Sequence, residues 1–146
     1  MNYIEMSNHH VQQVAALENA CFSCPWSLNA ITSELDNPLA LWLVAVQGDE
    51  LVGYIGSQTV MDETDVMNIA VDPRYRRKGI AEGLVRSLIE HLKNRGVHSL
   101  TLEVRCSNQP AISLYEKLGF AVVGRRPHYY SNPREDALIY RKEWEV

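Results

Sequence analysis

A break in an apolar segment near the middle of the chain limits the possible folds more than any other feature. Residues 67–71 have the apolar pattern of a strand, which ends at Asp72-Pro73. A basic turn containing Gly79 follows, and then apolar residues recur at helical spacing, at Leu84, Val85, Leu88, Ile89 and Leu92. This pattern predicts a strand, a glycine turn and an amphipathic helix over about 79–95. Free main-chain N–H groups at such a helix start, next to Arg and Lys, are suited to binding a pyrophosphate.

The basic turn has the form Arg-x-x-Gly-x-Ala over residues 76–81. No Gly-Lys-Ser/Thr follows it, so it is not a nucleotide-hydrolysing phosphate loop. It also lacks the Gly-x-Gly-x-x-Gly spacing of a dinucleotide-binding fingerprint. A solvated basic loop without a ligand is the alternative interpretation of these residues.

Length and charge place the chain among ordinary globular enzymes. Its 146 residues predict a single domain, 1–146, and a net charge of −4 argues against a nucleic-acid partner. No apolar run reaches the ~18–20 residues that a membrane span requires, and the N-terminus has no secretion-signal pattern. Three cysteines without framework spacing favour a cytoplasmic protein. Cys21 and Cys24 lack the further ligands of a zinc site, so we expect no metal.

The remaining periodicities predict seven strands and four helices. The order is βααβββαβαββ, which indicates an α/β fold with helices on both faces of one sheet. Strands are expected at 3–5, 39–46, 51–60, 65–71, 98–104, 121–124 and 136–144. Helices are expected at 8–20, after an N-cap at Ser27, at 79–95, and after an N-cap at Ser107 or Asn108.

Several segments together resemble one known family. The basic turn is similar to motif A of the GCN5-related N-acetyltransferases (GNAT), in which Arg/Gln-x-x-Gly-x-Gly/Ala follows a bulged strand. The likeness extends over nearly the whole chain and is greatest to the ribosomal-protein alanine N-acetyltransferase branch. It is carried by Pro25-Trp26-Ser27, residues 68–71, 102–105, 107–108, 111–116 and 118–120, and Arg125-Arg126 before Tyr129-Tyr130. The sequence departs from the family at Ala81, where many members have Gly, and at Cys24.

The resemblance implies a mixed, mostly antiparallel GNAT sheet and acetyl-CoA as co-substrate. Backbone groups of Ile69, Ala70 and Val71 would bind the pantetheine arm and the acetyl carbonyl. Asn108 would contact the pantetheine or the helix-proximal part of the cofactor. The pyrophosphate would lie against Arg77, Lys78, Gly79, Ile80, Ala81 and Glu82.

The resemblance also implies two proton carriers. Glu103 would accept a proton from the amine, directly or through one water, and Tyr115 would donate one to the leaving thiolate. On pattern alone, Glu103 could be a half-exposed strand carboxylate or a partner for Arg105, and Tyr115 could be a core aromatic.

The acceptor is expected to be the N-terminal alanine of a small-subunit ribosomal protein. An α-amine with a pKa near ~7.8 is neutral far more often at pH 7 than a lysine near ~10.4. Asp62 and Glu63, with Asp65, could attract a basic part of the acceptor, and Tyr129 and Tyr130 could clamp its chain. A water-facing acidic turn and a packed tyrosine pair are the alternatives. Rival functions are acetylation of lysine or a small amine, and a non-catalytic acyl-CoA-binding module.

Overall fold

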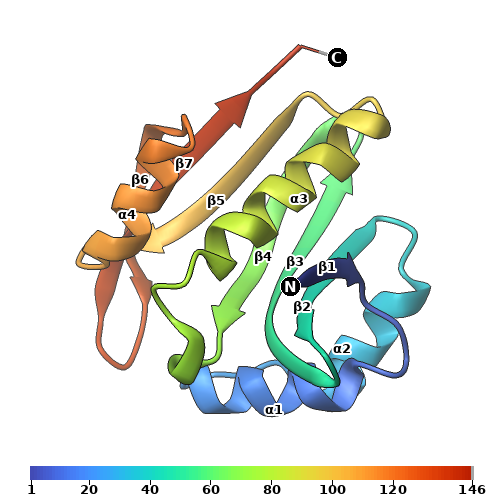
Figure 1. The fold of residues 1–146 in the computed structure, drawn as a ribbon. Helices are drawn as coiled ribbons and strands as arrows, with labels where there is room; N and C mark the ends of the chain where they lie inside the picture. The colour runs from blue at the N-terminus through green and yellow to red at the C-terminus, as the bar shows by residue number, and fades with distance from the viewer. Residues whose placement is uncertain (146) are drawn as a thin grey trace.

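The structure, a computed structural model, describes residues 1–145 (Figure 1). One seven-stranded sheet and its helices make up this part of the chain. The strands are β1 (Asn2–Glu5), β2 (Ala40–Gln47), β3 (Glu50–Val60), β4 (Glu63–Val71), β5 (Ser99–Arg105), β6 (Ala121–Tyr130) and β7 (Glu135–Glu143). The helices are α1 (Val11–Cys21), α2 (Leu28–Ser33), α3 (Ile80–Asn94) and α4 (Gln109–Lys117), with 3-10 turns at Glu34–Asp36 and Pro73–Tyr75.

The sheet is mixed and mostly antiparallel, as expected. Its strand order is β1-β2-β3-β4-β5-β7-β6. The pair β4–β5 is parallel and the other neighbouring pairs are antiparallel. The parallel pair is connected through α3, which crosses from the end of β4 to the start of β5.

Helices cover both faces of the sheet, because its inner strands are apolar on both sides. On β2, Leu41 and Leu43 face the core beneath α3 and α4, whereas Trp42 and Val44 face the core beneath α1 and α2. The α3 stripe is buried as its spacing predicts, with Leu84, Val85 and Leu88 fully enclosed. In Figure 1, α3 and α4 lie in front of the sheet and α1 crosses below it.

Strands β4 and β5 pair along only part of their length. Their register runs from Glu63 opposite Ser99 to Asp65 opposite Thr101 and then stops. The two arrows diverge from there toward their C-terminal ends (Figure 1). A bulge lies in β4 at the same point, because Asn68 pairs with Gly56 while Val66 pairs with Ser57, leaving Met67 without an opposite residue. The splay and the bulge position the candidate site.

Some boundaries differ from those expected from the sequence. The first helix begins at Val11, because Ser7–His10 form a turn closed by the His10 N–H to the Ser7 carbonyl, 2.9 Å. The sixth strand continues to Tyr130, well beyond residue 124, in an irregular pairing with β7. Ser27 caps α2 as predicted, accepting from the Ala30 N–H at 3.0 Å. No helix in residues 1–145 combines the length and apolar character needed to cross a membrane.

Candidate active site

The basic turn after β4 places free amides at the start of α3. The first backbone bond of this helix runs from the Gly83 N–H to the Gly79 carbonyl, 2.9 Å. The N–H groups of Ile80, Ala81 and Glu82 therefore lie in the first turn, where no intrahelical acceptor exists. Gly79 has φ +77°, a left-handed conformation that favours glycine. Its missing side chain faces open space, so backbone conformation accounts for this glycine without a ligand.

The charged side chains of this turn have different surroundings. Lys78 lies over the Tyr75 ring, 5.5 Å from its centroid. The Glu82 carboxylate accepts from Lys117 at 2.8 Å and from Arg86 at 3.0 Å. Glu82 can therefore contribute its main-chain N–H to an anion, while its side chain is held by two cations. Arg77 also adopts a positive φ, of 64°.

The splayed edge of β4 offers further main-chain groups. The Asp72 N–H donates to Val52 of β3 at 2.8 Å. Because alternate residues of a strand point their N–H groups to opposite neighbours, those of Ile69 and Val71 point toward β5. The β4–β5 pairing has ended before these residues. The Ala70 carbonyl instead faces β3, 3.0 Å from where a Cβ on Gly53 would lie. Of Ile69, Ala70 and Val71, therefore, only Ile69 and Val71 direct their N–H groups to the place where β4 and β5 diverge.

Asn108 lies where β5 gives way to α4. Its side chain caps that helix by accepting from the Ala111 N–H at 3.3 Å. The neighbouring Ser107 N–H donates to Glu135 at 2.8 Å, which ties the turn to β7. Asn108 is therefore placed at the C-terminal end of β5, on the side of the splay opposite Val71.

Glu103 projects from β5 on the face opposite the α3 core, because Leu102 and Val104 fill that core. One of its carboxylate oxygens, Oε1, lies 3.6 Å from the Arg126 guanidinium. The other, Oε2, is buried and has no hydrogen-bond partner among residues 1–145. A buried acceptor without a partner is uncommon and indicates a functional role or a bound group. Arg105 pairs with Glu135 at 3.3 Å, so the alternative of a Glu103–Arg105 pair is wrong.

Tyr115 projects from α4 into the core beside Phe120 and Tyr140, and is 5% exposed. Burial alone raises the pKa of its hydroxyl to about 12, with no hydrogen bond or nearby charge contributing. The phenol therefore keeps its proton at neutral pH. Tyr115 therefore lies in the core, as its helical spacing predicts, and no hydrogen bond contributes to the pKa of its hydroxyl.

Tyr129 and Tyr130 lie at the end of β6, and Arg126 lies between Tyr129 and Glu103, 5.5 Å from the Tyr129 centroid and 3.6 Å from the Glu103 carboxylate. The ring centroids of the two tyrosines are 5.0 Å apart, edge to face. Burial, together with the negative charge of Glu103, raises the pKa of the Tyr130 hydroxyl to about 12. Tyr129 is 51% exposed, which leaves one ring of the pair facing solvent.

The structure does not bring Asp62 and Glu63 to this group. Glu63 is opposite Ser99, four residues before Glu103 on β5. At about 3.3 Å per residue, that separation is roughly 13 Å. These two carboxylates lie at the paired end of β4 and β5, whereas Glu103 lies at the splayed end. A basic group bound at Asp62 and Glu63 would therefore be several residues away from a reacting N-terminus.

Glu18 of α1 is a buried polar residue that its sequence pattern did not single out. This side chain is fully buried, and three donors point at its carboxylate. Oε1 accepts from the Tyr54 hydroxyl and from Asn68 Nδ2 at 2.6 Å, and Oε2 accepts from the Trp26 N–H at 3.0 Å. Glu18 thus links α1, the α1–α2 connection and the bulged part of β4. A glutamate within the apolar stripe next to Leu17 was the only signal in the sequence.

Within residues 1–145, no three His, Cys, Asp or Glu side chains converge as metal ligands. Cys21, Cys24 and Cys106 are free thiols.

Comparison with known proteins adds independent findings. Residues 11–120 match the model of the acetyltransferase (GNAT) family. The [ribosomal protein bS18]-alanine N-acetyltransferase of Escherichia coli K12 is 40% identical over 125 residues, 84% of each chain. The crystal structure of the E. coli enzyme of that name superposes with a TM-score of 0.91 at 34% identity, covering 99% of this chain and 94% of that one. Arabidopsis thaliana NAA60, in complex with acetyl-CoA, has the same fold at 15% identity, with a TM-score of 0.86 and coverage of 98% and 99%.

Proposed function

Because the chain belongs to the acetyltransferase (GNAT) family, we propose that it acetylates the N-terminal alanine of ribosomal protein bS18. It is an acetyl-CoA-dependent N-acetyltransferase, since GNAT enzymes use that donor. The choice of acceptor rests on relatives about 40% identical that carry this name. Such an enzyme would act in the cytoplasm, where ribosomal proteins are made.

One observation supports the chemistry more than any other, namely the unpaired, buried Oε2 of Glu103 beside the splay of β4 and β5. In acetyl transfer, a neutral amine attacks the thioester carbonyl, a C–N bond forms and the C–S bond breaks. The attacking nitrogen must lose a proton and the departing sulfur must gain one. Glu103 has a free acceptor for the first proton, directly or through a water, and the protonated Tyr115 can supply the second.

The surrounding groups would hold the donor in place. The N–H groups of Ile80, Ala81 and Glu82, with Arg77 and Lys78, form an anion site suited to the pyrophosphate of coenzyme A. The amides of Ile69 and Val71 would hydrogen-bond the extended arm and the acetyl carbonyl, where a main-chain N–H stabilises developing negative charge. Asn108 would lie beside the arm from the β5 side.

The acceptor would approach on the Glu103 side. Tyr129 and Tyr130 form a wall of two edge-to-face rings there, and the exposed ring of Tyr129 can pack on an extended peptide. Arg126, 5.5 Å from the Tyr129 centroid and 3.6 Å from Glu103, is placed to hold both.

Steady-state release of coenzyme A from a synthetic peptide with the bS18 N-terminus tests this proposal. We expect Glu103→Gln to lower kcat by about 10²–10⁴-fold, since that is the usual contribution of a positioned general base. The matched control is Glu90→Gln, which removes an exposed carboxylate of α3 and should retain kcat. An N-blocked, lysine-containing twin of the peptide should not react. Acetylation of that twin, or full activity of Glu103→Gln, would contradict the assignment.

The pH dependence gives a second test. The rate should rise with pH as the acceptor α-amine, with a pKa near ~7.8, loses its proton. Because the pKa of Tyr115 is raised to about 12, deprotonation of this residue should cause no fall in rate below about pH 11. A descending limb near pH 9–10 that disappears in Tyr115→Phe would contradict the assigned environment.

A further inference from the structure

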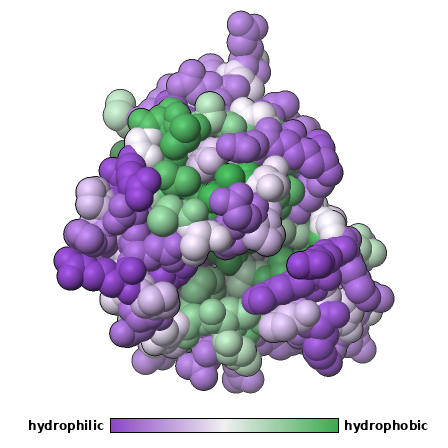
Figure 2. Space-filling model, turned by 90° about the vertical axis from the view of Figure 1, so that its left-hand side faces the viewer, coloured by the Kyte–Doolittle hydropathy of each residue, from purple (hydrophilic) through white to green (hydrophobic). Residues whose placement is uncertain are grey.

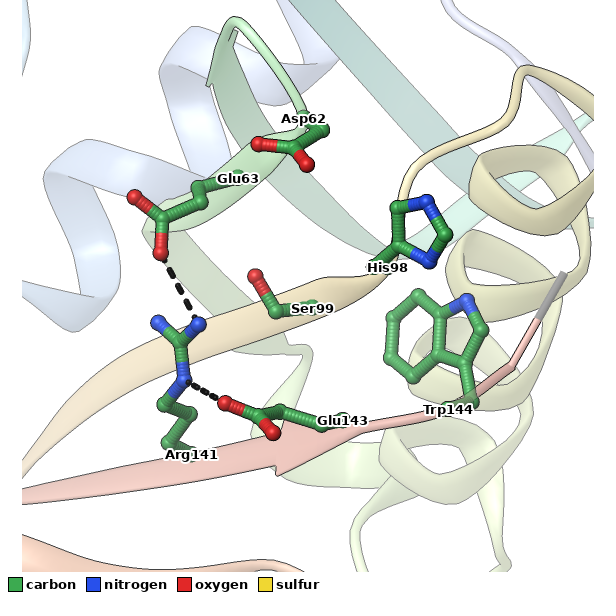
Figure 3. Close-up of a pocket in the computed structure, with 7 residues that line it drawn as sticks. All are labelled: Asp62, Glu63, His98, Ser99, Arg141, Glu143 and Trp144. Atoms are coloured by element: carbon green, nitrogen blue, oxygen red, sulfur yellow. Dashed lines mark hydrogen bonds and ion pairs between the residues drawn. The ribbon is translucent and has the colours of Figure 1, made fainter.

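A second group of charged side chains lines a hollow at the paired end of β4 and β5. The hollow has a volume of about 290 Å³ (Figure 3). Its walls include the carboxylates of Asp62, Glu63 and Glu143, together with Arg141, Ser99 and Trp144. These residues come from the start of β4, the start of β5 and the end of β7, so the strand pairing itself brings them together.

The hollow has an excess of negative charge. Arg141 donates to Glu63 and to Glu143, each at 2.8 Å. Three carboxylates around one guanidinium leave a net charge of −2 with His98, which also borders the hollow, neutral. The carboxylates of Glu63 and Glu143 are 63% and 69% exposed, so they remain open to a further cation.

Ser99 is a second and independent indication of a ligand. The residue is 1% exposed, and its hydroxyl has no hydrogen-bond partner within residues 1–145. In Figure 3 this hydroxyl points to the side of the hollow where Glu63 and Asp62 lie, away from Trp144. A serine hydroxyl has two acceptor lone pairs, which suit the N–H donors of an ammonium or guanidinium group. A buried and unsatisfied polar atom calls for such a partner.

Charge and geometry narrow the class of ligand. The carboxylates repel an anion, and within residues 1–145 no three ligating side chains converge on a metal position. The indole of Trp144 forms one wall, and an indole face attracts organic cations. The hollow therefore fits the end of an arginine or lysine side chain.

The hollow and Glu103 lie on the same face of the sheet. Ser99, Thr101 and Glu103 alternate along β5 with the core residues Leu100 and Leu102. On β7 their opposite residues, in the same order, are Glu143, Arg141 and Ile139. The helix α1 packs against β3 and β4. Thr101 of β5 and Ile139 of β7, which lie on the same face as Glu103, are only partly buried. An extended chain that starts at Glu103 would cover the roughly 13 Å to Ser99 in about four residues.

We propose that this hollow is an acceptor subsite, which binds an arginine or lysine side chain about four residues after the acetylated N-terminus. The proposal rests on the proposed function, because it requires a peptide whose first residue lies at Glu103. It explains the acidic turn at Asp62-Glu63 by specificity for a basic segment of the acceptor, remote from the reacting amine. The side chain at the fifth position of the acceptor would be the main one bound in the hollow. A long side chain at the fourth or sixth position could also reach it.

Kinetics with two matched peptides test the subsite. The probes are Ala-Gly-Ser-Gly-Arg-Ser-amide and the same peptide with Gln in place of Arg. We expect the wild-type KM for the Arg peptide to be about two- to fivefold lower, the range of a partly exposed ion pair. In the double variant Asp62→Asn with Glu143→Gln, the KM ratio should fall to about one. The control double variant Asp49→Asn with Glu90→Gln makes the same change in net charge at exposed positions elsewhere and should keep the wild-type ratio.

Ser99→Ala separates binding from a structural role. Removing a hydroxyl that has no protein partner should not lower Tm, but it should reduce the preference for the Arg peptide. Equal KM values for the two peptides with wild-type enzyme, or the same loss of preference in the control variant, would overturn the subsite. Calorimetry with both peptides in N-acetylated form measures the same preference for the Arg peptide as binding, without depending on turnover. If no free peptide is acetylated, the proposed function fails, whereas acetylation without discrimination removes only the subsite.

Discussion

Replacing Glu18 by glutamine should destabilise the protein through one specific contact. In the native protein both oxygens of the Glu18 carboxylate accept hydrogen bonds, and all three partners are donors. Glutamine keeps one oxygen and converts the other to an NH₂ group. In its better orientation the amide oxygen stays with Tyr54 and Asn68, and the NH₂ then faces the Trp26 N–H, donor against donor.

The size of the effect follows from the burial of the site. Glu18 is fully buried, so the NH₂ group of a glutamine at this position has no access to water, whereas Trp26 is partly buried. An unsatisfied buried donor costs about 1–3 kcal/mol. For a chain of this length, 1 kcal/mol corresponds to roughly 3 °C in Tm, so the variant should melt about 3–9 °C lower.

Thermal unfolding and amide hydrogen exchange together test this reasoning. Tm should fall in Glu18→Gln, and exchange of the Trp26 amide should speed up more than exchange in α3, because the lost bond lies on the α1–α2 connection. Tyr54→Phe is the matched control, since it removes one donor but leaves Trp26 bonded to Oε2. It should lower Tm without a selective change at Trp26. A Glu18→Gln protein that melts within 1 °C of the wild type, with Trp26 still protected, would refute the reasoning.

Four further outcomes follow from single contacts. Tyr115→Phe should lower kcat by about 10²-fold or more while the KM for acetyl-CoA stays unchanged in steady-state assays, as loss of a general acid requires. Gly56→Ala should lower Tm, because its Cβ would lie 2.5 Å from the buried Trp42 ring and such overpacking costs about 1–3 kcal/mol. Gly79→Ala should cost about 1–2 kcal/mol in denaturant unfolding, because it forces a left-handed φ of +77° on alanine, although its Cβ meets no atom. The Asp136 pKa is lowered, first by the His128 N–H and then by Arg125, so its contribution to stability is present above about pH 3.9 and is lost as pH falls through the folded value; Asp136→Asn should flatten this acid part of the Tm profile.

The edge strand β6 exposes apolar side chains to solvent. Figure 2, which faces the left-hand side of Figure 1, shows apolar areas among hydrophilic residues. Val122 and Val123 of β6 are 55% and 59% exposed. An exposed apolar edge strand can promote association, so Tm comparisons should be made at one fixed protein concentration.

Much of the fold could be predicted from local patterns. The apolar spacing of α3, the Ser27 cap and the alternation of β5 are properties of neighbouring residues, and all three appear in the structure. The order of elements and the mixed sheet were also predicted correctly. The sequence pattern predicts that the sixth strand ends at residue 124, whereas β6 continues to Tyr130 and still pairs with β7 there. Pro127 and the positive φ of His128 interrupt the regular strand in between.

The candidate site was only partly predictable. The resemblance to a known family named Glu103 and Tyr115, but their pattern alone fits a surface carboxylate and a core aromatic equally well. Three-dimensional packing separates these possibilities, because only the structure shows that Glu103 has one buried oxygen without a partner among the residues it describes. The sequence could not show that Glu18 contacts Tyr54 and Asn68, since these two residues are 36 and 50 positions away from it along the chain.

By itself, the sequence determined the basic turn after β4, the helix that follows it and the alternation that buries both faces of the sheet, because these depend on residues close together in the chain. Only the tertiary structure decided where β4 and β5 stop pairing, and with that which carboxylates share a site. The register places Glu103 at the splayed end and Glu63 beside Ser99 at the paired end. The physical reason is that strand register depends on packing across the whole sheet and on the bulge at Met67, and neither can be read from a single segment.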